Sequence, residues 1–156
     1  MNTAQRLPDI FLPETIDVLH ARIDALREES GPLWGKMTVS QMLAHCSIPL
    51  EQALDMRSDG PSWFMKLIMR SFFKKAMLNE KPYRPNLPTA PSFVVADLRL
   101  VEAERQRLKL LLGRFSGQGA AFFEGKMQIT LGALSSKEWS NLMYKHLDHH
   151  LRQFGV

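Results

Sequence analysis

The C-terminal segment, residues 135–156, constrains the fold of this chain most strongly, because it reads as one amphipathic helix with defined ends. Ser135 and Glu138 have the spacing of a capping box, in which each side chain bonds the backbone N–H of the other residue. Gly155 follows the last apolar residue, as is typical at helix ends. Apolar residues recur at helical spacing and predict one buried face, formed by Trp139, Leu142, Met143, Leu147, Leu151 and Phe154.

The same segment carries three histidines, His146, His149 and His150. At about 100° per residue, His146 and His150 lie about 40° apart and point to the buried face or its edge, whereas His149 leans towards the polar side. Two imidazoles one turn apart can bind one transition-metal ion, as in helical zinc sites. The alternative is a pair of half-buried histidines that are hydrogen-bonded inside a helix bundle.

Composition narrows the class of protein. The chain has 156 residues, of which 45% are apolar, and this predicts a single globular domain over residues 1–156. One cysteine, Cys46, excludes an internal disulfide and is typical of a reducing compartment. No apolar run has the length of a signal peptide or a membrane span, so we expect a cytoplasmic protein. The net charge of +4 gives no argument for a nucleic-acid partner.

The N-terminal half of the chain predicts two helices. Residues 1–12 read as a loose lead-in, and apolar residues at three- and four-residue steps then predict a helix from Pro13 to about Ser30. Thr38 and Gln41 form a second capping box, which predicts the start of a second helix.

His45 lies at the edge of the apolar face of the second predicted helix, as His146 does on the last one. Pro49 cannot donate a hydrogen bond to the carbonyl of His45, so we expect the helix to kink or loosen there. Such a kink either aims His45 into a site or serves packing alone. Cys46 points about 100° away, into the apolar face, and we expect a small buried residue rather than a ligand.

Residues 62–77 predict a short extra helix with Lys66, Arg70 and Lys74 on one face and aromatic and aliphatic residues on the other. One interpretation is a lid that packs on its own bundle and leaves its lysines in water. The other is a non-enzymatic bundle that binds a membrane surface or a protein partner through this basic aromatic segment. Residues 79–92 hold four prolines and predict an extended crossover.

Helical spacing predicts a further helix from Phe93 to Leu112, ended by Gly113. The connection that follows, residues 113–134, carries a short extended piece at Met127–Leu131. Four helices of this length with few strand signals predict an all-α four-helix bundle with a long crossover and a short extra helix.

Bundle cores commonly build metal sites from facing helices. His45 from the second helix and His146 with His150 from the last would supply three nitrogen ligands. Three protein ligands with an open position are typical of a catalytic zinc-type site rather than a structural one. Gln41 and Gln153 are candidates to orient the imidazoles by hydrogen bonds. The alternative is that both are ordinary surface amides.

Two stretches, residues 34–46 (WGKMTVSQMLAHC) and 131–156 (LGALSSKEWSNLMYKHLDHHLRQFGV), resemble the DUF1569 family of the DinB/YfiT-like superfamily of metalloenzymes. The resemblance covers nearly the whole chain and implies a four-helix bundle in which His45, His146 and His150 hold a divalent metal ion such as zinc or nickel. The superfamily includes metal-dependent transferases that use glutathione, mycothiol or bacillithiol. It therefore implies a small-molecule substrate, with a low-molecular-weight thiol as a candidate, and often a homodimer.

The sequence departs from this family pattern in the last loop. Relatives often carry a His-Pro pair where this chain has Gln128-Ile129, so substrate choice or activity itself could differ. His149 is a candidate either to contact and orient a ligand or to line the pocket beside the three ligands. Trp34 and Trp139 are expected in the core or as walls of the site.

Overall fold

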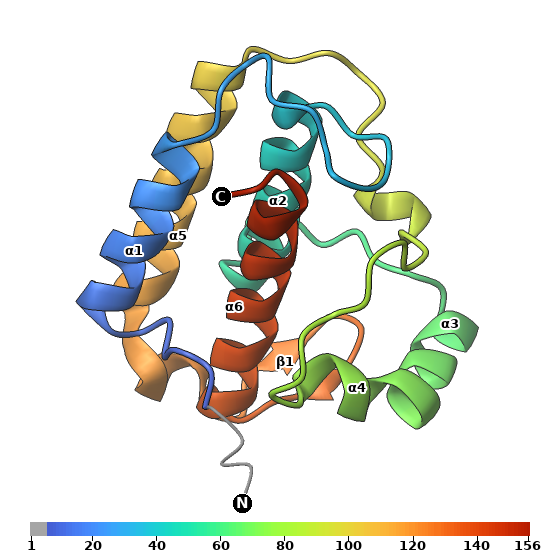
Figure 1. Cartoon of the computed structure of the whole chain (residues 1–156). Helices are drawn as coiled ribbons and strands as arrows, with labels where there is room; N and C mark the ends of the chain where they lie inside the picture. Colours follow the sequence, from blue (N-terminus) through green and yellow to red (C-terminus); the bar gives the residue numbers. More distant parts are fainter. Residues whose placement is uncertain (1–5) are drawn as a thin grey trace, which may run out of the picture.

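The computed structural model describes residues 6–156, and more than half of them are helical (Figure 1). The α-helices are α1 (Pro13–Asp24), α2 (Val39–Ala53), α3 (Trp63–Ile68), α4 (Lys74–Leu78), α5 (Val101–Phe123) and α6 (Ser136–Gln153). A π-helical turn, η1 (Met69–Phe73), joins α3 to α4, and a 3-10 turn, η2 (Pro91–Phe93), lies in the crossover. Two short antiparallel strands, β1 (Met127–Gln128) and β2 (Gly132–Ala133), form a hairpin before α6.

The four longest helices pack on one another around a shared core (Figure 1). α5 lies against α1 and α2, and α6 contacts all three. Large apolar side chains from all four fill the centre, among them Leu19, Leu43, Leu108, Phe115 and Trp139. The mostly helical fold that the sequence predicts is confirmed. None of the helices in residues 6–156 combines the length and the apolar character needed to cross a bilayer.

Both predicted capping boxes are present. The Ser135 N–H donates to Glu138 Oε2 at 2.8 Å, and the Glu138 N–H donates to Ser135 Oγ at 3.2 Å. Thr38 and Gln41 exchange the same two bonds at the start of α2. α2 continues as helix through Pro49 to Ala53. The starts of the two helices that carry the histidines are therefore set by local sequence.

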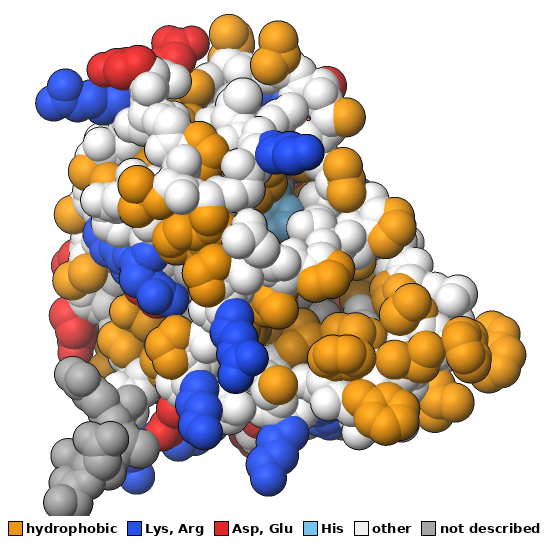
Figure 2. All heavy atoms as spheres, turned by 45° about the vertical axis from the view of Figure 1, so that its right-hand side comes forward, with side chains coloured by type: hydrophobic (Ala, Val, Ile, Leu, Met, Phe, Trp, Pro, Cys, Tyr) orange, Lys and Arg blue, Asp and Glu red, His pale blue; other side chains and the backbone are white. Residues whose placement is uncertain are grey.

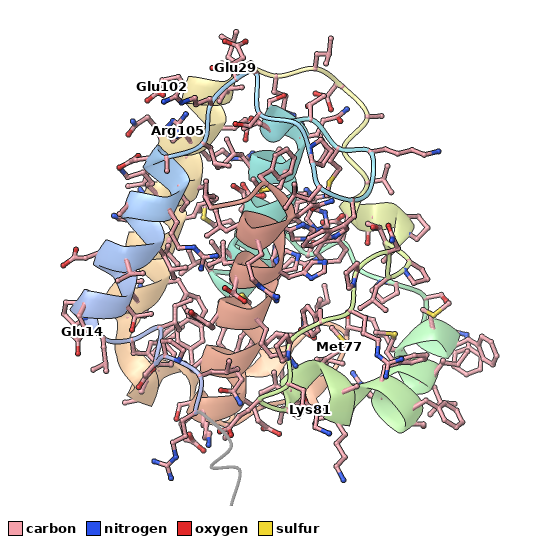
Figure 3. The ribbon with its side chains drawn as sticks, in the orientation of Figure 1. Glu14, Glu29, Met77, Lys81, Glu102 and Arg105 are labelled. Carbon is pink, nitrogen blue, oxygen red and sulfur yellow. The ribbon has the colours of Figure 1, made fainter. Side chains whose placement is uncertain are left out.

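The first helix is shorter than predicted, because α1 ends at Asp24 and not near Ser30. Arg105 of α5 lies beside this end of α1, next to Glu102 (Figure 3). Its guanidinium donates to the carbonyl oxygens of Ile23 and Leu26, the latter at 2.9 Å. Carbonyls at a helix end need such partners, and here α5 supplies them.

The lead-in is not loose where the structure describes it; residues 1–5 of that prediction lie outside the described residues. Ile10 is fully buried, and its N–H donates to Ser140 Oγ of α6 at 3.1 Å. The residues just before α1 are thus attached to the last helix.

The prediction of a helix from Phe93 to Leu112 is wrong at both ends. Phe93 closes η2, residues 94–100 are not helical, and α5 begins only at Val101. It then runs past Gly113 to Phe123, with a break at Gly119, where φ is +77°. Each interior glycine costs about 1 kcal/mol relative to alanine, but the buried rings of Phe115 and Phe123 offset this cost.

The segment α3–η1–α4 packs on the rest of the protein with the side opposite to the one predicted for a lid. Its basic side faces the hairpin: Arg70 Nε donates to the Thr130 carbonyl at 2.9 Å and Lys74 Nζ to the Ala133 carbonyl at 3.3 Å. Its aromatic side faces solvent, with Trp63 and Phe72 each 77% exposed. The expectation that the apolar side packs on the bundle is therefore wrong.

Part of the polar side of α6, at Asn141 and Lys145, is covered by other segments of the chain. Asn141 Nδ2 donates to the Leu78 carbonyl at 2.9 Å, and Lys145 Nζ donates to the Ala76 carbonyl at 2.9 Å and to Asn79 Oδ1 at 3.1 Å. α4 and the residues after it therefore lie across α6 and bury the side on which His149 projects.

Candidate metal centre

Three histidines converge between α2 and α6. His45 projects from α2, and His146 and His150 project from consecutive turns of α6. One ring nitrogen from each lies within 4.8 Å of the others, and the Nε2 atoms of His45 and His146 are 2.9 Å apart. The structure thus brings together the three residues that the sequence singled out, from positions about 100 residues apart.

Two of the three imidazoles are held by hydrogen bonds from the outer nitrogen. His45 Nδ1 lies 2.8 Å from the Phe93 carbonyl oxygen, which can only accept, so Nδ1 carries the proton. His150 Nδ1 lies 2.8 Å from Gln153 Oε1, while Gln153 Nε2 donates to the Trp34 carbonyl at 2.6 Å. That second bond fixes the orientation of the amide. Both Nε2 atoms therefore carry lone pairs, and an acceptor on Nδ1 is the usual arrangement around a metal-binding histidine.

His146 differs from its two neighbours. Because His45 Nε2 carries no proton, the 2.9 Å contact makes His146 Nε2 the donor in the metal-free protein. His146 Nδ1 is enclosed and has no hydrogen-bond partner. To act as a ligand through Nε2, His146 would therefore have to lose that proton.

Burial keeps the cluster neutral. It lowers the pKa of His45, against the effect of the Phe93 carbonyl. It lowers the pKa of His146 well below its usual value, and the neighbouring His150 and His45 add to the effect. The pKa of His150 falls to about 3, again mainly through burial. Near neutral pH the three rings are uncharged, which is the form that binds metal.

The donor set fits a divalent transition-metal ion. Zinc–nitrogen bonds of about 2.0–2.1 Å place tetrahedral ligand nitrogens about 3.4 Å apart. That spacing lies between the closest contact of 2.9 Å and the 4.8 Å limit of the cluster. Imidazole ligands suit zinc, nickel, copper and iron. The three histidines could therefore hold a metal ion and leave positions open for other ligands.

Aromatic side chains from two connections, the one between α1 and α2 and the crossover between α4 and α5, lie beside the cluster. The ring of Phe93 lies 5.9 Å from that of His45, and His149 lies between Trp34 at 5.6 Å and Tyr83 at 5.9 Å, measured between ring centroids. His149 is buried, and its Nδ1 has no hydrogen-bond partner. Figure 2 shows a histidine side chain at the floor of a hollow, with hydrophobic side chains, a basic side chain and polar or backbone atoms around it. A histidine of the protein is therefore visible from the surface.

Other candidates from the sequence have different places. Gln41 belongs to the capping box and donates to the Ala96 carbonyl, so it does not orient a histidine. Gln128 Oε1 accepts from the N–H groups of Thr130 and Leu131 and shapes the hairpin turn. Cys46 is buried, and burial raises the pKa of its thiol. Trp139 packs in the core against Phe123, whereas Trp34 is a wall of the site.

Sequence reasoning missed Tyr83 and Phe93 as residues of the site. Both lie in or near the proline-rich crossover, where hydrophobic periodicity carries no information. Their position beside His149 and His45 depends on the path of the crossover across α2 and α6.

A family model described as a protein of unknown function, DUF1569, matches residues 12–155. The chain belongs to the DUF1569 family. The match runs from the start of α1 to the end of α6 and includes all three clustered histidines of this DUF1569 protein. No curated protein and no solved structure matches the chain significantly.

Proposed function

We propose that this DUF1569 protein is a divalent-metal-dependent enzyme, a thiol transferase or a hydrolase, in which His45, His146 and His150 hold the ion. One observation supports the proposal most: three neutral imidazoles converge, and two of them already have their outer nitrogens bonded to fixed acceptors. Zinc or nickel is the ion that we propose. We further propose that the chain folds as a single domain, a DinB/YfiT-like four-helix bundle formed by α1, α2, α5 and α6.

The chemistry of such a site follows from its ligands. An ion held by three imidazoles supplies a Lewis acid that lowers the pKa of a water or a thiol and so provides a nucleophile at neutral pH. The protein itself orients the imidazole rings and excludes water from the site. The Phe93 carbonyl and Gln153 hold two rings in place, and Trp34, Tyr83 and Phe93 form apolar walls.

The proposed substrate is a small molecule that fits between these aromatic walls, with a low-molecular-weight thiol as the second substrate of a transferase. Cys46 is too deeply buried to act as a nucleophile in place of that thiol. We also propose that the protein is cytoplasmic, since a single cysteine suits a reducing compartment, and that it is a homodimer, as the family resemblance implies.

Elemental analysis of protein purified without a histidine tag tests the metal site. We expect about one equivalent of zinc or nickel per chain in the wild type, and its loss in His45→Ala and His146→Ala. His20→Ala is the matched control, because His20 lies on α1 outside the cluster. Unchanged metal content in the two cluster variants would falsify the proposed site.

Turnover is tested separately from metal content. The metal-loaded protein is incubated with glutathione or bacillithiol and an electrophile, and with ester and amide substrates. We expect one of these to be converted, with activity lost on chelation and restored by the ion. Stoichiometric metal without conversion of either class would contradict the enzymatic part of the proposal and leave a metal-binding domain.

A further inference from the structure

The segment of residues 62–81 exposes a group of large apolar side chains to solvent, its apolar face. Six of its large side chains are each between 44% and 77% exposed, namely Trp63, Phe64, Met65, Leu67, Phe72 and Phe73. None of the residues of α3 or η1 is buried. Figure 2 shows hydrophobic side chains gathered along the right-hand edge of the molecule, where this segment projects in Figure 1. Exposed apolar patches of this kind mark surfaces that bind something.

The segment is held in this orientation by polar contacts on its other sides. Arg70 and Lys74 donate to carbonyls of the hairpin, and Lys145 of α6 donates to the carbonyl of Ala76. Met77 packs against the core, whereas Lys81 points to solvent at the lower edge of the molecule (Figure 3). The aromatic residues therefore face outward because the opposite side is bonded to the rest of the protein.

The surroundings of the apolar face are cationic. A shallow groove of about 480 Å³ runs beside Phe72 and is lined by Arg70, Lys74 and Lys75. Glu138 also lines it, but this carboxylate accepts from the backbone N–H of Ser135. Lys66 and Lys81 extend the positive charge along the segment, and its single acid, Glu80, is paired with Lys137.

We propose that residues 62–81 bind the surface of an anionic bilayer. The aromatic side chains would enter the boundary between headgroups and acyl chains, where tryptophan and phenylalanine are favoured, and Lys66, Lys75 and Lys81 would contact lipid headgroups. Each cation near an anionic leaflet strengthens the attraction to it. This surface is independent of the proposed metal site.

Charge favours a lipid surface over a second copy of the chain. A two-fold contact through this face would bring the same patch of each copy together. Lys66 and Lys75 would then lie opposite a patch of their own sign. An anionic membrane instead complements the lysines and accepts the aromatic residues together.

Sedimentation with vesicles tests the proposal. We expect the wild type to bind vesicles of phosphatidylcholine with 30 mol% phosphatidylserine, and to bind pure phosphatidylcholine at least about tenfold more weakly. Trp63 is far more exposed than Trp34 or Trp139, so tryptophan emission should shift to the blue on binding and lose this shift in Trp63→Phe. Raised salt should weaken binding, because surface charges are screened.

Two double variants remove the aromatic and the cationic contributions to binding separately. Trp63→Ser with Phe72→Ser, and Lys66→Glu with Lys75→Glu, should each weaken binding by about tenfold or more. Matched controls are Leu98→Ser with Leu100→Ser, which alter equally exposed apolar side chains, and Lys36→Glu, and both should bind as the wild type does. Lys66 is partly exposed and the other substituted side chains are exposed, so each variant should fold, and circular dichroism checks this.

Three outcomes would overturn the proposal. The wild type could fail to bind anionic vesicles, or it could bind both vesicle types equally well. It could also be a dimer in sedimentation velocity that Trp63→Ser with Phe72→Ser dissociates, without vesicle binding by the wild type. That last result would assign the face to a second copy of the chain.

Discussion

Gly35 lies so close to the side chain of Gln153 that a β-carbon at position 35 would stand 2.7 Å from Gln153 Nε2. Gly35 also has a φ of +78°, which favours glycine. Gln153 in turn donates to the Trp34 carbonyl and accepts from His150 Nδ1. The backbone of residues 34–35 is thus coupled through one amide to the orientation of His150.

Gly35→Ala should displace the Gln153 amide and so loosen His150. We expect a loss of about 1–3 kcal/mol in the free energy of unfolding, from the positive φ and the close contact together, and a metal affinity about tenfold weaker. Urea denaturation and competition with a metal indicator measure the two effects. Gly31→Ala is the control, since no atom lies within 4 Å of its β-carbon position. Equal behaviour of the two variants would show that the contact is unimportant.

Gln153→Glu and Gln153→Leu should separate the two roles of this amide. Glutamate keeps an oxygen that accepts from His150 Nδ1 but loses the donor to the Trp34 carbonyl, whereas leucine loses both. We expect metal affinity to fall about 10–100-fold in Gln153→Leu and to stay close to the wild-type value in Gln153→Glu. Both variants should be less stable to urea. A similar loss of affinity in both would mean that Gln153 acts on the site through the loop alone.

The sequence predicted what depends on neighbouring residues. Both capping boxes lie within four residues of sequence, so the starts of α2 and α6 and the one-turn spacing of His146 and His150 could be predicted. That His45 lies beside this pair could be predicted only with the expectation of a helix bundle and with the family resemblance. A local sequence pattern does not predict the distance between two side chains, such as His45 and His146, that are 101 residues apart in the chain.

The errors arise where distant segments meet. α5 runs through Gly113 because Phe115 and Phe123 continue its buried face. Helix propensity does not include the free energy that the burial of these two rings contributes. Residues 94–100 are not helical, although their spacing suggests it, and the carbonyl of Phe93 just before them is bonded to His45. Periodicity alone does not predict that Lys145 is buried, because α4 and the residues after it, which cover Lys145, are distant in sequence from α6.

Arg107 should be the most important charged residue for attaching α5 to α2. Its guanidinium pairs with Glu51 of α2 and, at 3.0 Å, with Glu104, and both carboxylates are nearly buried. Arg107→Ala leaves Glu51 without its cation. We expect the free energy of unfolding to fall by about 2 kcal/mol, less than the roughly 3–5 kcal/mol of a fully buried pair, because Arg107 is itself partly exposed.

Equilibrium unfolding in urea measures this loss, and Lys137→Ala is the control. Lys137 pairs with Glu80 at the surface, so its removal should change the free energy of unfolding by less than about 1 kcal/mol. Adding Glu51→Gln to Arg107→Ala should recover part of the stability, because the unpaired buried charge is then removed. No recovery would indicate that Arg107 acts by packing and not by charge.

Lys145 should hold the segment that covers the site. Its ammonium donates to the Ala76 carbonyl and Asn79 Oδ1 and lies 4.5 Å from the centroid of the Tyr83 ring, while burial lowers its pKa to about 8. Lys145→Met keeps the volume of the side chain but leaves the carbonyl of Ala76 without this donor. We therefore expect faster amide hydrogen exchange and faster proteolytic cleavage over residues 76–84, with the free energy of unfolding lowered by about 1–3 kcal/mol. Lys36→Met, on an exposed loop, should change neither rate. Unchanged exchange at residues 76–84 in Lys145→Met would show that Asn141 and the apolar contacts of Leu78 suffice to hold this segment on α6.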